Sequence, residues 1–129
     1  MPVLSLTEAT TLVADALQRC RTSQENAELV ATALVRAEAE GLKSHGLLRV
    51  PMYAAQAKIG KVNGFAAPSI EQPRPGLLAI DAKFGFAYPA MYAAVDLLPE
   101  MARACGIAEQ VRKMRSLSRA HWCGQRRKG

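Results

Sequence analysis

The sequence predicts a mostly α fold, in which a helical N-terminal unit precedes a short segment with one strand and one helix. Half of the 129 residues are apolar, aromatic residues make up only 5%, and apolar side chains recur at helical spacing. A sandwich of strands would instead need many β-branched and aromatic residues. No run of about 18 apolar residues is present, so no membrane span is expected.

The first two helices are expected to form an antiparallel hairpin. The first covers about residues 7–20, with Thr7 as its cap and Glu8 at the positive end of its dipole. The second begins at Ser23 and ends at Gly41, because the residue after a helix often has a positive φ. A connection of two or three residues favours antiparallel packing. The predicted apolar stripes are Ala9, Leu12, Val13, Ala16, Leu17 and Cys20, then Leu29, Val30, Ala33, Leu34 and Ala37.

A third helix is expected to begin at residue 49 or 50 and to end before Gly60. Pro51 fits the first turn of a helix and fits its interior poorly. The predicted inner stripe consists of Leu48, Met52, Ala55 and Ile59. Ser44 and His45 therefore fall in an irregular turn between two helices, where functional side chains are often presented.

The second half of the chain is punctuated by glycine and proline. Residues 61–76 are interpreted as a connector on the surface, and the apolar run at residues 77–81 predicts a strand. A fourth helix is expected after the loop at residues 84–86 and should end at Gly106. Pro99 should kink this helix or divide it in two. Its predicted inner face consists of Met91, Val95 and Leu98.

The net charge of +6 is confined to the C-terminal end of the sequence. Residues 1–108 carry ten basic and ten acidic side chains, whereas residues 109–129 carry seven basic side chains and one acidic side chain. Apolar periodicity also stops at residue 109, and the sequence that follows is a poor strand. We interpret residues 109–129 as a basic tail that is disordered or read from a shifted frame. A tail that contacts nucleic acid is the alternative.

The three cysteines, Cys20, Cys105 and Cys123, are widely spaced and odd in number. This pattern fits free thiols better than a disulfide framework or a metal site. The N-terminus lacks the pattern of a signal peptide. The expected location is the cytoplasm.

The most informative stretch is the Ser-His-Gly turn, residues 41–49, with the sequence Gly-Leu-Lys-Ser-His-Gly-Leu-Leu-Arg. His45 is the best candidate for a general acid or base, and Ser44 could hydrogen-bond to a substrate oxygen. Arg49 could hold a carboxylate through two hydrogen bonds, and Tyr53, one turn later, could add a hydroxyl. The structural alternative is that Ser44 and His45 satisfy backbone groups while Arg49 is a solvated charge.

A family resemblance favours the functional interpretation. It is carried by residues 34–46, Leu-Val-Arg-Ala-Glu-Ala-Glu-Gly-Leu-Lys-Ser-His-Gly, and by Leu48-Arg49, Pro51, Tyr53, Ala79-Ile80-Asp81 and Gly85-Phe86. Through these residues the segment 5–108 resembles the malate/L-lactate dehydrogenase family, NAD(P)-dependent oxidoreductases that include ureidoglycolate dehydrogenase and cyclic imino-acid reductases. The resemblance implies substrate roles for Ser44, His45 and Arg49.

The resemblance also implies a function and a domain organisation. It implies hydride transfer between NAD or NADP and a 2-hydroxy or 2-oxo acid, in a protein that is a homodimer when intact. The expected units are a helical substrate-side domain at residues 1–60, the connector at 61–76, an incomplete α/β cofactor domain at 77–108, and the tail. This cofactor domain is not a Rossmann fold, and no Gly-x-Gly-x-x-Gly motif follows a strand here.

The resemblance weakens beyond residue 108. Members of the family are more than twice as long, so we expect a truncated and inactive copy in which most of the cofactor-binding region is missing. The family has a second histidine in a Ser-His-His-x-Gly turn, and His121 is either its displaced counterpart, with a proton-transfer role, or an accident of a shifted frame. The alternative function is a small helical binding or oligomerisation module whose basic tail contacts nucleic acid.

Overall fold

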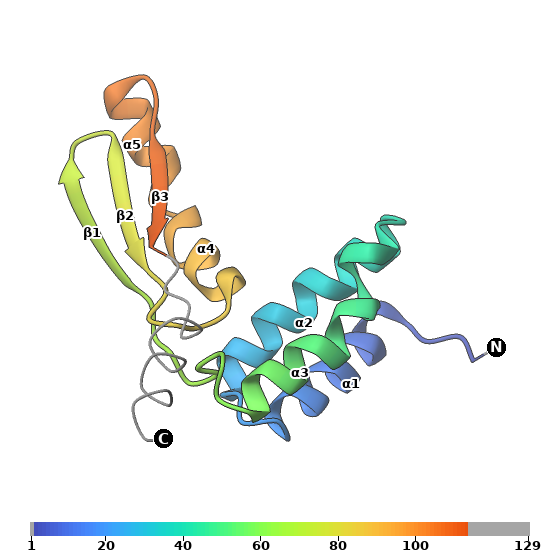
Figure 1. Cartoon of the computed structure of the whole chain (residues 1–129). Helices are drawn as coiled ribbons and strands as arrows, with labels where there is room; N and C mark the ends of the chain where they lie inside the picture. The colour runs from blue at the N-terminus through green and yellow to red at the C-terminus, as the bar shows by residue number, and fades with distance from the viewer. Residues whose placement is uncertain (1, 114–129) are drawn as a thin grey trace, which may run out of the picture. The chain divides into compact units, whose positions relative to one another are not determined.

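The computed structural model describes residues 2–113 of the chain (Figure 1). Its contacts divide the chain after Gly60 into two units, which are described separately below. Among the described residues, the regular elements of the first unit are helices, and those of the second are helices and strands. None of the helices in residues 2–113 is both long and apolar enough to cross a membrane.

Helix α1 (Leu6–Gln18) begins with a capping box. Ser5 Oγ accepts a hydrogen bond from the Glu8 N–H at 3.2 Å, and the Glu8 carboxylate accepts one from the Ser5 N–H at 2.8 Å. The hydrogen bond from the Ser5 backbone is the main reason that the pKa of Glu8 lies below its ordinary value. The prediction that Thr7 caps this helix is therefore wrong, because Ser5 occupies the N-cap.

Helix α2 (Gln24–Ala39) begins where predicted. Ser23 is its N-cap and accepts a hydrogen bond from the Asn26 N–H at 3.3 Å. Helices α1 and α2 pack antiparallel, as predicted (Figure 1). Their connection, residues 19–23, is longer than expected, and within it Arg21 has a left-handed φ of 65°.

The core of the first unit lies between α1 and α2. The buried apolar side chains are Val13, Ala14 and Leu17 of α1 and Ala27, Val30, Ala31, Leu34 and Val35 of α2. Leu12, predicted to be buried, is 61% exposed. Leu12 and Val13 lie about 100° apart around the helix, so a neighbour that covers Val13 leaves Leu12 outside.

Helix α3 (Val50–Lys58) has the predicted boundaries, with Pro51 in its first turn. Its predicted inner stripe is wrong, because Leu48 is 72% exposed and Ile59 is 74% exposed. Ala57 is the one residue of α3 that is buried within the described part of the chain.

The second unit contains a sheet in the order β1-β2-β3, formed by β1 (Ser69–Arg74), β2 (Leu77–Asp81) and β3 (Glu109–Lys113). Strand β1 is antiparallel to β2, and β3 is parallel to it. The strand at 77–81 is confirmed, whereas the sequence predicted neither β1 in the connector nor β3 in the tail. Both are polar edge strands, and the register of β1 shifts between Glu71 and Arg74, where Pro73 cannot donate to the ladder.

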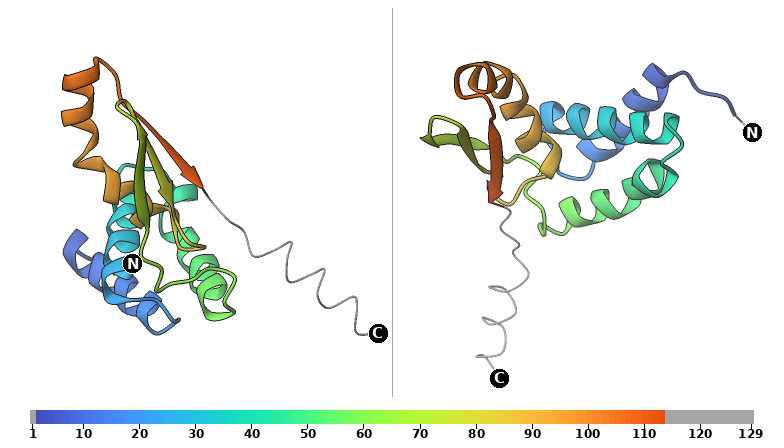
Figure 2. Two further views of the ribbon diagram at one scale, coloured as in Figure 1. Left: turned by 90° about the vertical axis from the view of Figure 1, so that its left-hand side faces the viewer. Right: turned by 90° about the horizontal axis from the view of Figure 1, so that it is seen from above.

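Two helices follow β2, α4 (Ala87–Val95) and α5 (Leu98–Cys105), and they cover one face of the sheet (Figure 2). Pro99 lies at the start of α5, so the predicted division at this proline is confirmed. Gly106 ends α5 with a φ of 82°, also as predicted. The core of this unit consists of Leu78, Ile80, Ala82, Ala90 and Ala94, with Ile70, Leu98 and Met101 packed against it. Val95, predicted to face inward, is 49% exposed.

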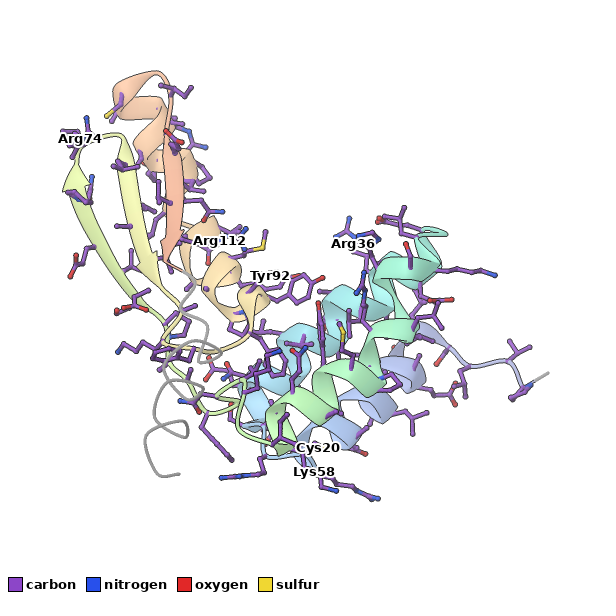
Figure 3. The ribbon with its side chains drawn as sticks, viewed as in Figure 1. Cys20, Arg36, Lys58, Arg74, Tyr92 and Arg112 are labelled. Carbon is purple, nitrogen blue, oxygen red and sulfur yellow. The ribbon has the colours of Figure 1, made fainter. Side chains whose placement is uncertain are left out.

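The described cysteines are free thiols. Cys20 follows α1 and is half-buried (Figure 3), and Cys105 ends α5 and is exposed. Cys123 lies outside the described residues.

Candidate functional site

The Ser-His-Gly turn joins α2 to α3 and begins where α2 ends. Gly41 has a φ of 84°, and its N–H donates to the Glu38 carbonyl at 3.1 Å. The Leu42 N–H donates to the Ala37 carbonyl at 2.8 Å. These two bonds form a Schellman motif, which satisfies the last carbonyls of α2 and turns the chain away from the helix axis.

Two short 3₁₀ turns follow, η1 (Lys43–His45) and η2 (Leu47–Arg49). Gly46 lies between them and is buried, although the side chains on either side of it are exposed. A Cβ at Gly46 would lie 2.9 Å from Glu38 Cβ and 3.0 Å from Glu38 Cα. Glycine is therefore required here because the turn lies directly against α2.

Ser44, His45 and Arg49 form a connected group. Ser44 Oγ lies 3.0 Å from His45 Nδ1, and Arg49 Nε donates to the Ser44 carbonyl at 2.7 Å. Ser44 and His45 are exposed and Arg49 is half-buried. The structure thus brings together the three residues that the motif singled out.

These hydrogen bonds determine which atoms of the His45 imidazole and the Arg49 guanidinium are left to contact a bound molecule. Because Nδ1 faces the Ser44 hydroxyl, Nε2 is the ring nitrogen of His45 that can exchange a proton with a bound molecule. Because Nε of Arg49 is engaged with the backbone, Nη1 and Nη2 are the pair that can bind a carboxylate end-on. The group can therefore hold a small acid and exchange a proton with it.

Two further residues, Tyr53 and His121, were predicted to belong to the site. Tyr53 lies about one turn beyond Arg49 on α3 and is half-buried, and its substrate role stays a prediction. His121 lies outside the described residues.

Sequence reasoning missed Glu38. Its half-buried carboxylate accepts a hydrogen bond from the Leu47 N–H at 3.0 Å. The sequence did contain a signal for this contact. The helix dipole disfavours a carboxylate in the last turn of a helix, so a carboxylate there suggests a hydrogen-bond donor nearby.

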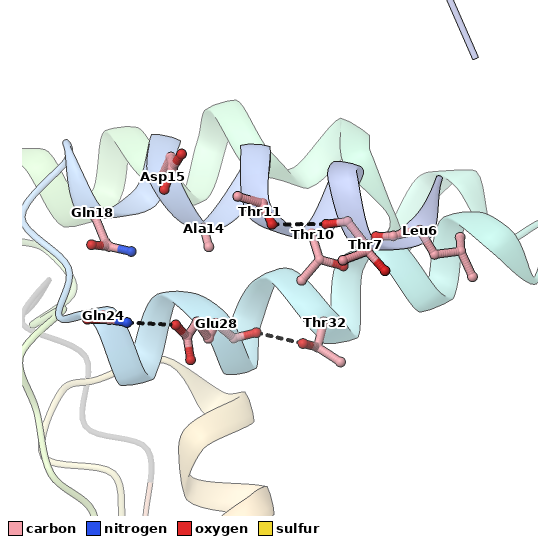
Figure 4. Close-up of a pocket in the computed structure, with 10 residues that line it drawn as sticks. All are labelled: Leu6, Thr7, Thr10, Thr11, Ala14, Asp15, Gln18, Gln24, Glu28 and Thr32. Carbon is pink, nitrogen blue, oxygen red and sulfur yellow. Dashed lines mark hydrogen bonds between the residues drawn. The ribbon is translucent and has the colours of Figure 1, made fainter. Parts of the chain in front are cut away.

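The described residues also form hollows away from the turn. A groove of about 700 Å³ between α1 and α2 is shown in Figure 4, and a depression of about 190 Å³ lies on the sheet. In the groove, Thr10, Thr11 and Thr32 donate their hydroxyls to carbonyls of their own helices. These three hydroxyls are therefore engaged within their helices.

The chain is similar in sequence to a family of dehydrogenases and reductases. Residues 4–126 match the profile of the malate/L-lactate dehydrogenase family. The chain is 40% identical over 105 residues to (2R)-3-sulfolactate dehydrogenase (NADP(+)) of Chromohalobacter salexigens, covering 81% of this chain and 31% of that protein. It is 38% identical over 105 residues, with the same coverage, to the Delta(1)-pyrroline-2-carboxylate reductase of Ancylobacter novellus.

Comparison with solved structures agrees. The delta1-piperideine-2-carboxylate reductase of Pseudomonas syringae pv. tomato superposes with a TM-score of 0.84 at 32% identity, covering 88% of this chain and 34% of that one. The chain thus spans about a third of the length of the relatives that it matches.

Proposed function

Because this chain belongs to the malate/L-lactate dehydrogenase family of oxidoreductases, we propose that it forms the substrate-side part of an enzyme that transfers a hydride between NAD or NADP and a 2-hydroxy or 2-oxo acid. The observation that carries the proposal is the linked group of Ser44, His45 and Arg49. The names of the relatives support the substrate class, because sulfolactate and pyrroline-2-carboxylate are both small carboxylates.

Each member of the group has a distinct role in this proposal. Arg49 binds the substrate carboxylate through Nη1 and Nη2. His45 gives or takes a proton through Nε2 at the substrate oxygen, or at the nitrogen of a cyclic imine. Ser44 orients the imidazole through Nδ1, and Tyr53 contributes to the substrate pocket.

The cofactor would supply the hydride, but the glycine-containing turn before α4 does not fit its pyrophosphate. A cradle of free backbone N–H groups is expected around a pyrophosphate. A Cβ at Gly85, in the turn before α4, would lie 2.7 Å from Ala66 Cβ and 2.9 Å from the Ala82 carbonyl, so protein atoms already fill the space beside it. Pro89 removes a further N–H from the first turn of α4. We assign none of the described residues to the cofactor.

The intact protein is proposed to be a homodimer. Exposed apolar side chains in the Ser-His-Gly turn, on α3 and directly after α3 offer surface for a partner or for further chain, among them Leu42, Leu48, Met52 and Ile59. The nucleic-acid alternative is not favoured by the relatives, and most of the basic tail lies outside the described residues.

The isolated 129-residue chain is expected to show no turnover of NADH or NADPH with pyruvate. It spans 31% of the sulfolactate dehydrogenase and 31% of the pyrroline-2-carboxylate reductase that it matches, and none of its described residues is assigned to the cofactor. Absorbance at the nicotinamide band measures this directly, with a full-length relative as the positive control. Turnover above background that disappears in His45→Ala would contradict the expectation.

Replacing Arg49 by lysine is expected to weaken pyruvate binding by about tenfold or more, because lysine cannot reproduce two parallel hydrogen bonds to a carboxylate. The affinity is measured by following NMR signals of the chain during a pyruvate titration. Arg36→Lys is the matched control, since Arg36 is exposed on α2 and paired with Glu40 (Figure 3). Equal affinity of the two variants would remove Arg49 from the site.

A further inference from the structure

Two glutamates lie at the C-terminal end of α2, and they have different environments. Glu40 is exposed and forms an ion pair with Arg36 at 2.9 Å, one turn earlier on the same helix. Glu38 is half-buried and reaches out of the helix, accepting a hydrogen bond from the Leu47 N–H at 3.0 Å. Glu38 thus connects α2 to a segment nine residues further along the chain.

The position of Glu38 is electrostatically unfavourable for a carboxylate. The C-terminal end of a helix carries partial negative charge, which repels an anion in the last turn. The Leu47 N–H lies at the start of the second 3₁₀ turn, where backbone donors have no partner within the turn itself. The hydrogen bond with the Leu47 N–H therefore stabilises the Glu38 carboxylate and also holds the turn against α2.

This hydrogen bond between Glu38 and Leu47 lies in the middle of the candidate site. Leu47 follows Gly46, whose backbone lies against Glu38 Cα and Cβ. His45 precedes this glycine, and Arg49 ends the turn that Leu47 begins. A shift of Leu47 away from α2 would move both His45 and Arg49, because a single residue separates each of them from Leu47.

We propose that Glu38 is a positioning residue that acts through the Leu47 N–H to fix the spacing of His45 and Arg49. This inference rests on the proposed function for its significance, although the geometry that it predicts can be tested separately. Glu38 touches no substrate in this scheme. Its carboxylate acts as a hydrogen-bond acceptor, and its charge is secondary.

The test compares Glu38→Ala, Glu38→Gln and Glu40→Ala in the full 129-residue chain. Three quantities are measured by NMR: hydrogen exchange of the Leu47 amide, the ¹⁵N shifts that report the tautomer of His45, and the affinity for pyruvate. Glu38→Ala should speed exchange of the Leu47 amide about tenfold, change the ¹⁵N shifts of His45 and weaken pyruvate binding. Glu38→Gln keeps an acceptor oxygen and should retain most of the wild-type behaviour.

Glu40→Ala removes the same charge from the same helix end and should leave all three quantities unchanged. Faster exchange of the Leu47 amide in Glu38→Ala with unchanged ¹⁵N shifts of His45 would show a merely structural role and overturn the proposal. The proposal would also be overturned if Glu38→Gln differed from the wild type as much as Glu38→Ala does. If Glu38→Ala does not fold, Glu38→Asp replaces it in the test, because its carboxylate is set back by one methylene. This variant should show faster exchange of the Leu47 amide and changed ¹⁵N shifts of His45. Wild-type values of both quantities would overturn the proposal. Absence of pyruvate binding by the wild-type chain would instead count against the proposed function. The positioning role of Glu38 would then be decided by the Leu47 exchange rate and the His45 shifts alone.

Discussion

Gly46→Ala is expected to destabilise the first unit by about 1–3 kcal/mol and to abolish measurable pyruvate binding. The new methyl group would lie 2.9 Å from Glu38 Cβ and 3.0 Å from Glu38 Cα, so the turn must move away from α2. This movement would stretch the bond between Leu47 and Glu38 and separate His45 from Arg49. Urea denaturation measures the loss of stability, and an NMR titration with pyruvate measures the loss of binding.

Gly41→Ala is the matched control for this prediction. No atom lies within 4 Å of a Cβ placed at Gly41, but its φ of 84° is strained for alanine. Gly41→Ala should therefore lower stability while leaving pyruvate binding close to that of the wild type. Wild-type binding by Gly46→Ala would mean that close contact between the turn and α2 is not needed for the site.

Leu34→Ala is expected to lower the free energy of unfolding by about 2–5 kcal/mol. Leu34 is fully buried between the helices of the first unit, at 0% exposure, and its removal leaves a cavity. Leu48→Ala removes the same atoms from a side chain that is 72% exposed and should change stability by less than about 0.5 kcal/mol. Urea denaturation followed by circular dichroism compares the two variants. Equal losses would contradict the assignment of the core to the α1–α2 interface.

Local signals in the sequence predicted the ends of helices well. Ser23, Gly41, Pro51 and Gly106 act through their own backbone or side chain, so their effects can be read without the rest of the fold. The capping box at residues 5–8 is equally local, and attention to the Ser-x-x-Glu pattern would have placed the cap at Ser5 in place of Thr7.

Burial was predicted less well, because periodicity shows that a helix is amphipathic without showing what covers it. Leu12, Leu48 and Val95 lie at apolar positions of their helices, and each is exposed in the described part of the chain. Strands β1 and β3 were missed for a related reason. Their residues are polar, and they are strands because they pair with the apolar strand β2.

The candidate site was only partly predictable. Ser44, His45 and Arg49 are close in sequence, so a motif could identify them together. The bond from Arg49 Nε to the Ser44 carbonyl and the contact between Glu38 and Leu47 depend on how the turn folds back on α2. The candidate residues could thus be identified from the sequence, whereas the contacts that hold them beside α2 required the structure.

His45 and Arg49 are proposed to act together on one small carboxylate. The most direct measurement is an NMR titration of the wild-type chain with pyruvate, in which the ring signals of His45 and the guanidinium signals of Arg49 are followed in the same samples. If both residues bind the same pyruvate molecule, both sets of signals should move along one saturation curve with a single Kd. Movement of one set without the other, or of neither up to high millimolar pyruvate, would contradict it.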